Sequence, residues 1–126
     1  MVDPSSDSAL EESCTAARLF GIVWDTMADV IGTTATATLV RRSIKRAASR
    51  RAELSAVSVV RQGLHYAYTV PDDWSRSGSD PVVALRELVA ELSPLLSELA
   101  GPVLVRRLAS VPDLQRCHIH FAGGTR

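Results

Sequence analysis

The stretch SAVSVVRQGLHYAYTVP, residues 55–71, decides the fold class of this 126-residue chain. Its β-branched and aromatic residues surround a Gln62-Gly63 turn, a pattern that predicts a β-hairpin. We expect strands over 56–60 and 64–70, with Tyr66 and Tyr68 on one face of the second strand and His65 on the other. Because a two-stranded ribbon is marginal in water by itself, the hairpin should pack against helices or a further strand.

The segment before the hairpin has the periodicity of helices. Apolar residues recur at intervals of three and four over 10–31 and again over 35–48, on either side of Gly32. Glycine costs about 1 kcal/mol relative to alanine inside a helix, and two threonines follow it here. We therefore expect a break or a kink at Gly32.

The segment after the hairpin also predicts helices. Asp80 followed by Pro81 is typical of a helix N-terminus, and a leucine-rich stripe continues as far as Gly101. Pro94 lies within that stripe and removes one internal hydrogen bond, so we expect it to kink the helix. Pro102 then begins a shorter helix that should stop near Pro112.

The phrase Leu-Val-Arg-Arg occurs twice, at 39–42 and at 104–107. Each copy follows an apolar helical stretch interrupted by a glycine, Gly32 or Gly101. The phrase is too short to establish a duplication. It suggests two helical units of related design.

These elements predict an α+β fold, mainly helical, with about four helices packed on a small antiparallel sheet. The hairpin over 55–70 supplies two strands, and alternation over 116–121 makes that segment a candidate third strand. An all-α bundle with an extended arm is the alternative. We expect a leader over 1–7, one globular domain over 8–121 and a flexible tail over 122–126.

Composition limits the function classes. Hydrophobic residues make up 46% of the chain and aromatics only 5%, which suits close helix packing. No window has the roughly 18 consecutive apolar residues that a transmembrane helix requires, so we expect no membrane partner. The long segments are apolar on more than one side, which predicts a homodimer with a helix face at its interface.

Charge is distributed unevenly, although the formal net charge is zero. Residues 41–62 hold seven basic residues and one acid, whereas residues 1–40 hold six acids and one base. The candidate partner-binding residues lie on one helix: Arg41, Arg42, Lys45, Arg46 and Arg50. This basic helix face is suited to an acidic or phosphorylated protein partner; nucleic acid is a less favoured partner because aromatic stacking residues are missing nearby. A solvated face that balances the acidic N-terminal segment is the simpler interpretation.

Metal-competent side chains cluster near the C-terminus. On a strand, His118 and His120 would project to the same face, and pairing with 64–70 would add His65. Imidazole nitrogens and the thiolate of Cys117 suit a transition metal. These four residues form the candidate metal site, and ordinary surface histidines beside a small buried cysteine are the alternative.

No motif in the sequence fixes a reaction, so enzymatic activity is left open and not favoured. The two cysteines, Cys14 and Cys117, have no framework spacing, which predicts reduced thiols and a cytoplasmic location, with Cys14 in the core. We expect a small cytoplasmic regulatory adaptor that homodimerises and binds an acidic partner through the basic helix face. The alternatives are a metal- or small-ligand-binding sensor or enzyme built on the histidine and cysteine cluster, and a nucleic-acid-associated protein.

Overall fold

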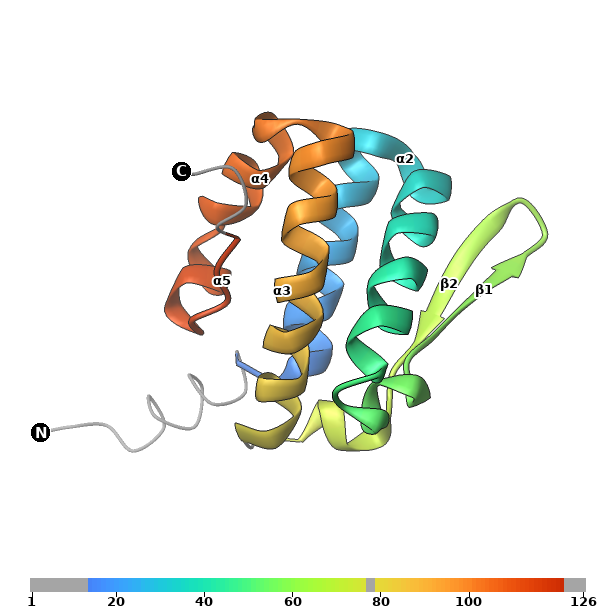
Figure 1. Ribbon diagram of the computed structural model, residues 1–126, viewed down its shortest axis with the longest axis vertical. Helices are drawn as coiled ribbons and strands as arrows, with labels where there is room; N and C mark the ends of the chain where they lie inside the picture. The colour runs from blue at the N-terminus through green and yellow to red at the C-terminus, as the bar shows by residue number, and fades with distance from the viewer. Residues whose placement is uncertain (1–13, 77–78, 122–126) are drawn as a thin grey trace, which may run out of the picture.

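A computed structural model describes residues 14–76 and 79–121, and they form the expected mainly helical α+β fold (Figure 1). The leader and tail predicted at 1–7 and 122–126 lie outside this part of the chain. Four α-helices and one two-stranded antiparallel hairpin make up the described fold. The elements are α2 (Ala16–Ala48), η1 (Ala52–Ala56), β1 (Ser58–Gln62), β2 (His65–Thr69), η2 (Asp72–Ser75), α3 (Ser79–Ala100), α4 (Pro102–Ala109) and α5 (Pro112–Arg116).

Helix α2 reverses direction at Gly32, which confirms the predicted break. Gly32 has φ 85° and ψ 163°, a backbone conformation that residues other than glycine rarely adopt. The hydroxyl of Thr36 donates to the Gly32 carbonyl at 2.7 Å, so a side-chain hydrogen bond joins the first turn after the break to Gly32. The two halves of α2 therefore run in opposite directions (Figure 1).

A second corner of the same kind joins α3 to α4. Gly101 has φ 80° and ψ 177°, close to the values of Gly32, and Pro102 occupies the first position of α4. Pro94 lies inside α3, which continues beyond it to Ala100. In both Leu-Val-Arg-Arg segments the Leu-Val pair is buried and the arginines are exposed.

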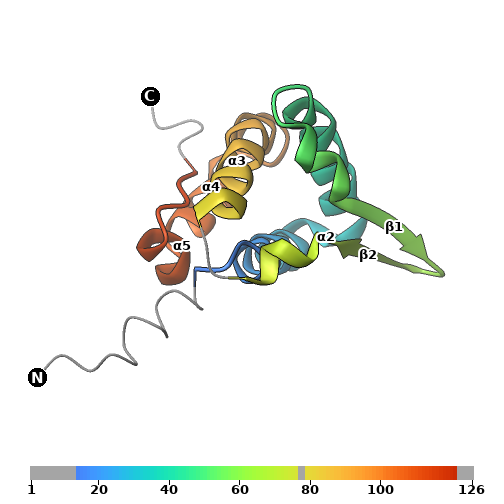
Figure 2. The same cartoon turned by 90° about the horizontal axis from the view of Figure 1, so that it is seen from below.

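The hairpin projects from the helical bundle (Figure 1). Its two-residue turn is Gly63-Leu64, one position later than predicted, because Gln62 pairs with His65. From below, the base of the ribbon lies against α2 while its tip extends away from every helix (Figure 2). Tyr66, Ala67 and Tyr68 are half-buried and His65 is exposed, so burial along β2 does not follow the predicted alternation.

An aromatic cluster anchors the base of the hairpin on α2. The Tyr68 ring lies edge-on to the Phe20 ring at 4.7 Å and 5.1 Å from the Trp24 ring, with Trp74 completing the group. A Cβ atom added to Gly21 would lie 3.0 Å from the Tyr68 hydroxyl oxygen. Glycine at this position therefore permits the close approach of the hairpin to the helix.

The third strand predicted over 116–121 does not form, because the sheet has two strands in the described residues. Helix α5 begins at Pro112 and runs to Arg116, and His118 then turns the chain with φ 60°. Residues beyond that turn keep the predicted alternation, since Ile119 and Phe121 are buried and His120 is exposed. Their apolar side chains pack into the helical core without any strand partner.

Candidate functional site

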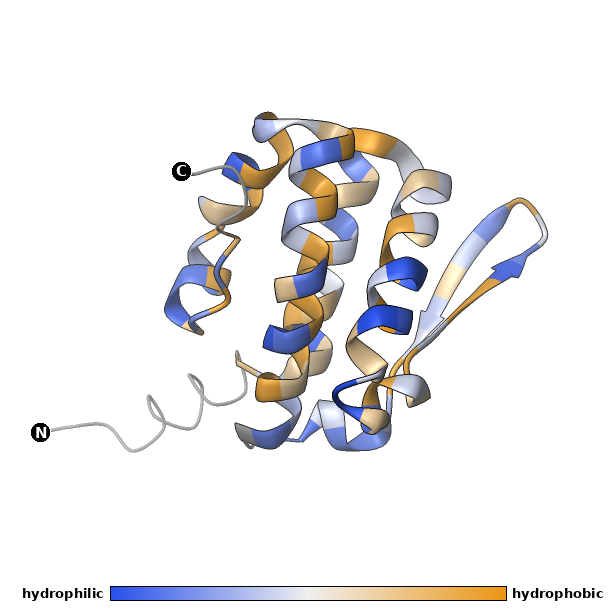
Figure 3. Cartoon of the chain, in the orientation of Figure 1, coloured by the Kyte–Doolittle hydropathy of each residue, from blue (hydrophilic) through white to orange (hydrophobic). Residues whose placement is uncertain are grey.

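Four residues of the predicted basic helix face lie on the second half of α2, and Arg50 follows the end of the helix at Ala48. All five of its residues are exposed, while Val40, Ile44 and Ala47 on the opposite side are buried. Figure 3 shows two strongly hydrophilic turns in this part of α2, next to the hairpin. The predicted separation of an apolar side from a cationic side is therefore present, but the five cations have different contacts.

Arg41 holds the hairpin. Its Nε and Nη2 atoms donate to the Val59 carbonyl at 3.1 and 2.9 Å, and its guanidinium carbon lies 5.7 Å from the centre of the Tyr66 ring. A planar fork of donors fits a single carbonyl and an aromatic face at the same time. Arg41 is therefore a structural contact between α2 and the hairpin.

Arg50 holds α3. Its Nη1 atom lies 2.6 Å from a Glu91 carboxylate oxygen, and its Nη2 atom lies 3.4 Å from Glu87. The hydrogen bond from Arg50 to Glu91 raises the pKa of the arginine above its ordinary value, with smaller contributions from the charges of both carboxylates. These carboxylates leave Arg50 less available to an outside partner.

Arg42, Lys45 and Arg46 differ from those two cations. Their spacing of three and four residues places them on one side of α2, and all three are exposed. Within 14–76 and 79–121, none of these three side chains forms an ion pair or a hydrogen bond, although the Arg46 carbonyl accepts from the Ser49 hydroxyl at 2.7 Å. We call them the open basic triplet. The sequence pattern located this face but gave no means of separating the triplet from Arg41 and Arg50.

The candidate metal site is not assembled. His65 lies on the hairpin, which projects on the opposite side of the bundle from α5 and the C-terminal segment (Figure 1). The rings of His118 and His120 lie 6.2 Å apart between centres, and both residues are exposed. Cys117 is bonded to Cys14 and is not available as a thiolate. Across the described ranges, no group of three or more His, Cys, Asp or Glu side chains is placed to hold a metal ion.

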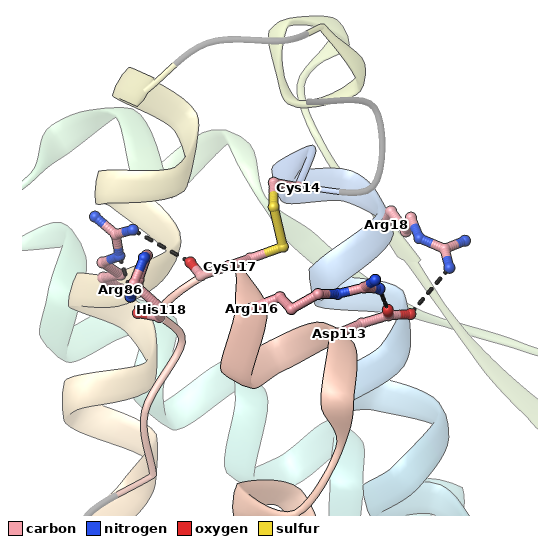
Figure 4. Close-up of a disulfide and its surroundings, with 7 residues drawn as sticks. All are labelled: Cys14, Arg18, Arg86, Asp113, Arg116, Cys117 and His118. Carbon is pink, nitrogen blue, oxygen red and sulfur yellow. Dashed lines mark hydrogen bonds and ion pairs between the residues drawn. A yellow bond between two sulfur atoms is a disulfide. The ribbon is translucent and has the colours of Figure 1, made fainter. Parts of the chain in front are cut away.

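The disulfide corrects the prediction of reduced thiols and of a free Cys14 in the core. Cys14 and Cys117 are joined with a Cα–Cα distance of 5.4 Å and are separated by 103 positions in the sequence (Figure 4). Arg86 of α3 donates to the carbonyls of Cys117 and His118, both at 3.2 Å. The C-terminal segment is thereby fixed to α2 and to α3.

An ion-pair group lies beside the disulfide. Asp113 accepts from Arg18 of α2 at 3.0 Å and also from Arg116 (Figure 4). The two arginines are exposed and Asp113 is half-buried, so the pairs contribute little to stability and serve mainly to orient α5. Neither this group nor the disulfide was predicted from spacing in the sequence.

Tyr68 is a half-buried titratable group of the hairpin. Burial against α2 raises the pKa of its phenol above 10.0, and the negative charge of Asp25 raises it further. The cause is the loss of water around the phenolate form. Tyr68 belongs to the hairpin anchor, and its altered pKa reports that packing.

Comparison with protein-family models, curated proteins and solved structures gives no match to this chain. In the described residues, no helix is both long enough and apolar enough to cross a membrane. The open basic triplet gathers three exposed cations on one side of a helix, and these side chains have no ion pair in the described residues.

Proposed function

We propose that this chain is a small regulatory adaptor that homodimerises and binds an acidic protein partner through the open basic triplet. The observation that carries the proposal is the division of the basic helix face. Arg41 and Arg50 have partners within the fold, whereas Arg42, Lys45 and Arg46 present three positive charges to solvent. A patch of one sign raises the rate of encounter with a partner of the opposite sign.

The neighbouring carboxylates support this interpretation. Glu87 and Glu91 of α3 form ion pairs with Arg50. A carboxylate oxygen of Glu53 lies 3.2 Å from Nη1 of Arg51. These three acids are thus already paired with arginines outside the triplet. Carboxylates that neutralise the triplet would then come from another molecule.

The test compares two triple variants with equal loss of charge. In the first, Arg42→Ala, Lys45→Ala and Arg46→Ala remove the open basic triplet. In the matched control, Arg61→Ala, Arg76→Ala and Arg106→Ala remove three exposed cations from other elements. Fluorescence anisotropy with a labelled poly-glutamate peptide measures affinity over a range of salt concentrations.

The triplet variant should lose about tenfold or more in affinity and most of its salt dependence, because rim charges act mainly on association rate. The control variant should bind as the unmodified chain does. Equal loss in both variants would contradict a localised site. Tight binding to a labelled DNA duplex, with a steep salt dependence, would replace the protein partner with nucleic acid.

The location of the protein bears on the class of partner. The sequence predicts a cytoplasmic location, but disulfides persist mainly in oxidising compartments, so Cys14–Cys117 favours one of those. Alkylation of free thiols at the moment of cell lysis, followed by mass spectrometry, distinguishes the two. Alkylated cysteines would support the cytoplasm, and an intact disulfide would support an oxidising compartment.

A further inference from the structure

The two outer edges of the hairpin differ. On the β1 edge, Arg41 covers the Val59 carbonyl with two hydrogen bonds. On the β2 edge, the described residues supply no hydrogen bond to the backbone from any group outside β1. An uncovered strand edge is a template for pairing with another strand.

The register identifies the groups on the open edge. Because the turn has two residues, Gln62 and His65 form the closing hydrogen-bonded pair, and every second pair after it is not hydrogen-bonded. Val59 is opposite Tyr68 in such a pair, which agrees with the outward direction of its carbonyl toward Arg41. The backbone groups of Tyr66 and Tyr68 therefore point outward on the β2 side.

The residues of β2 do not guard this edge. The strand HYAYT contains neither proline nor lysine, which are residues that commonly block edge pairing. Ala67 at its centre is small. Leu64 in the adjacent turn is 88% exposed, the largest exposure among the large hydrophobic residues of the described chain.

The helix faces expose less apolar surface for a dimer interface than the sequence predicted. The apolar stripes of α2 and α3 are buried within one copy of the chain. Large hydrophobic residues that remain exposed in the described ranges lie at helix ends or on the hairpin: Val30, Val60, Leu64, Leu99 and Val103. A homodimer is therefore better built on the hairpin than on a helix face.

We infer that β2 pairs with β2 of a second copy of this chain, in antiparallel register about a two-fold axis at Ala67. Tyr66 of each copy would then face Tyr68 of the other across a hydrogen-bonded pair. The exposed Leu64 would lie opposite Val70 of the second copy, a residue that packs against the core. Two marginal ribbons become one four-stranded sheet with the β1 strands outermost.

A second copy is the occupant that this edge fits because the pairing is self-complementary. Under a two-fold axis, each donor on one β2 meets the matching acceptor on the other, as an isologous interface requires. On the β1 edge, Arg41 already occupies the outward carbonyl of Val59, so this edge is less open than the β2 edge to further strand pairing. The inference gives an interface to the homodimer of the proposed function and rests on that dimer, but it does not depend on the open basic triplet.

The test places like charges on the axis. Ala67→Lys brings two ammonium groups together across the proposed interface, whereas Val60→Lys adds the same charge to the paired residue on the same face of the hairpin, one strand further away. Sedimentation equilibrium of the full chain measures the dimer Kd. Ala67→Lys should raise the Kd by about tenfold or more, and Val60→Lys should leave it close to that of the unmodified chain.

Two further measurements guard against misfolding of the lysine variant. A mixture of Ala67→Lys and Ala67→Glu should restore the dimer, because opposite charges then meet at the axis. Leu64→Ser alters a residue that is exposed in the single copy and should also weaken the dimer. A monomeric unmodified chain would overturn both the dimer and this interface. A dimer unaffected by Ala67→Lys and by Leu64→Ser would overturn the interface alone, and poly-glutamate binding would still test the triplet.

Discussion

The two Leu-Val-Arg-Arg segments have the same four residues and comparable glycine corners before them, but their arginines have different contacts. In residues 39–42 the first arginine binds the Val59 carbonyl and the second belongs to the open basic triplet. In residues 104–107 the order is reversed, because Arg107 pairs with Asp29 at 2.8 Å and Arg106 is exposed. Local sequence sets the helix and the buried pair, whereas tertiary neighbours decide which cation is left to solvent.

The largest expected effect is that of the disulfide, which should restrain the two Leu-Val-Arg-Arg segments to different degrees. Reduction of Cys14–Cys117 should lower the free energy of unfolding by about 4–5 kcal/mol in the chain-entropy description, since the bond closes a loop of 103 positions. Helix α4 is joined through α5 to the segment that carries Cys117, so amides of 104–107 should exchange hydrogen faster than those of 39–42. Hydrogen exchange with and without reductant measures the difference.

The double variant Cys14→Ser/Cys117→Ser serves as the control for the reductant. It should show the same loss of stability and should not respond to reduction. Equal acceleration of exchange in both segments would mean that the disulfide stabilises the whole fold uniformly and would remove this distinction between them.

Alanine substitution at Gly32 and at Gly101 should lower the free energy of unfolding by similar amounts. Gly32→Ala and Gly101→Ala each place a side chain at a φ near +80° with no atom within 4 Å of the new Cβ, so the cost is backbone strain alone. We expect each variant to lose about 1–3 kcal/mol in urea unfolding. A large cost at one corner and none at the other would show that the corners are not equivalent.

Much of the fold follows from periodicity and from special residues. The hairpin, the break at Gly32 and the end of α3 at Gly101 were all predicted, because glycine geometry and alternation act over short distances. The strand predicted at 116–121 is wrong, since Pro112 starts α5 and His118 turns the chain away from the sheet. In residues 116–121 the alternation of apolar and polar residues indicates which side chains are buried, but it does not indicate that these residues form a strand.

The sequence predicted the location of the basic helix face but not the contacts of each of its cations. Helical spacing predicted one face for the five cations; Arg41, Arg42, Lys45 and Arg46 lie on α2, and Arg50 lies just beyond its end at Ala48. Whether each cation has a partner depends on residues far away in the sequence, such as Glu91 on α3 and Val59 on β1. The disulfide was missed for the same reason, because a separation of 103 positions gives no local signal.

A smaller effect tests the first arginine of each segment. Arg41→Ala removes two hydrogen bonds to Val59 and the contact with Tyr66, and should cost about 1–2 kcal/mol. Arg106→Ala changes an exposed side chain and should cost less than about 0.5 kcal/mol. Chemical denaturation of both variants gives the comparison. Equal costs would mean that Arg41 does not hold the hairpin.

The smallest effect appears only at high pH and concerns the other hairpin anchor. Burial raises the pKa of Tyr68 in the folded chain, so the unfolded chain loses its phenol proton first as the pH rises past 10.0. The stabilisation is complete below the unfolded pKa and is lost as the pH rises through the folded one. Tyr68→Phe should remove this loss in unfolding curves, while Tyr66→Phe should retain it. A Tyr68→Phe variant with the same decline above pH 10.0 would show that the aromatic cluster at the base of the hairpin is not the source.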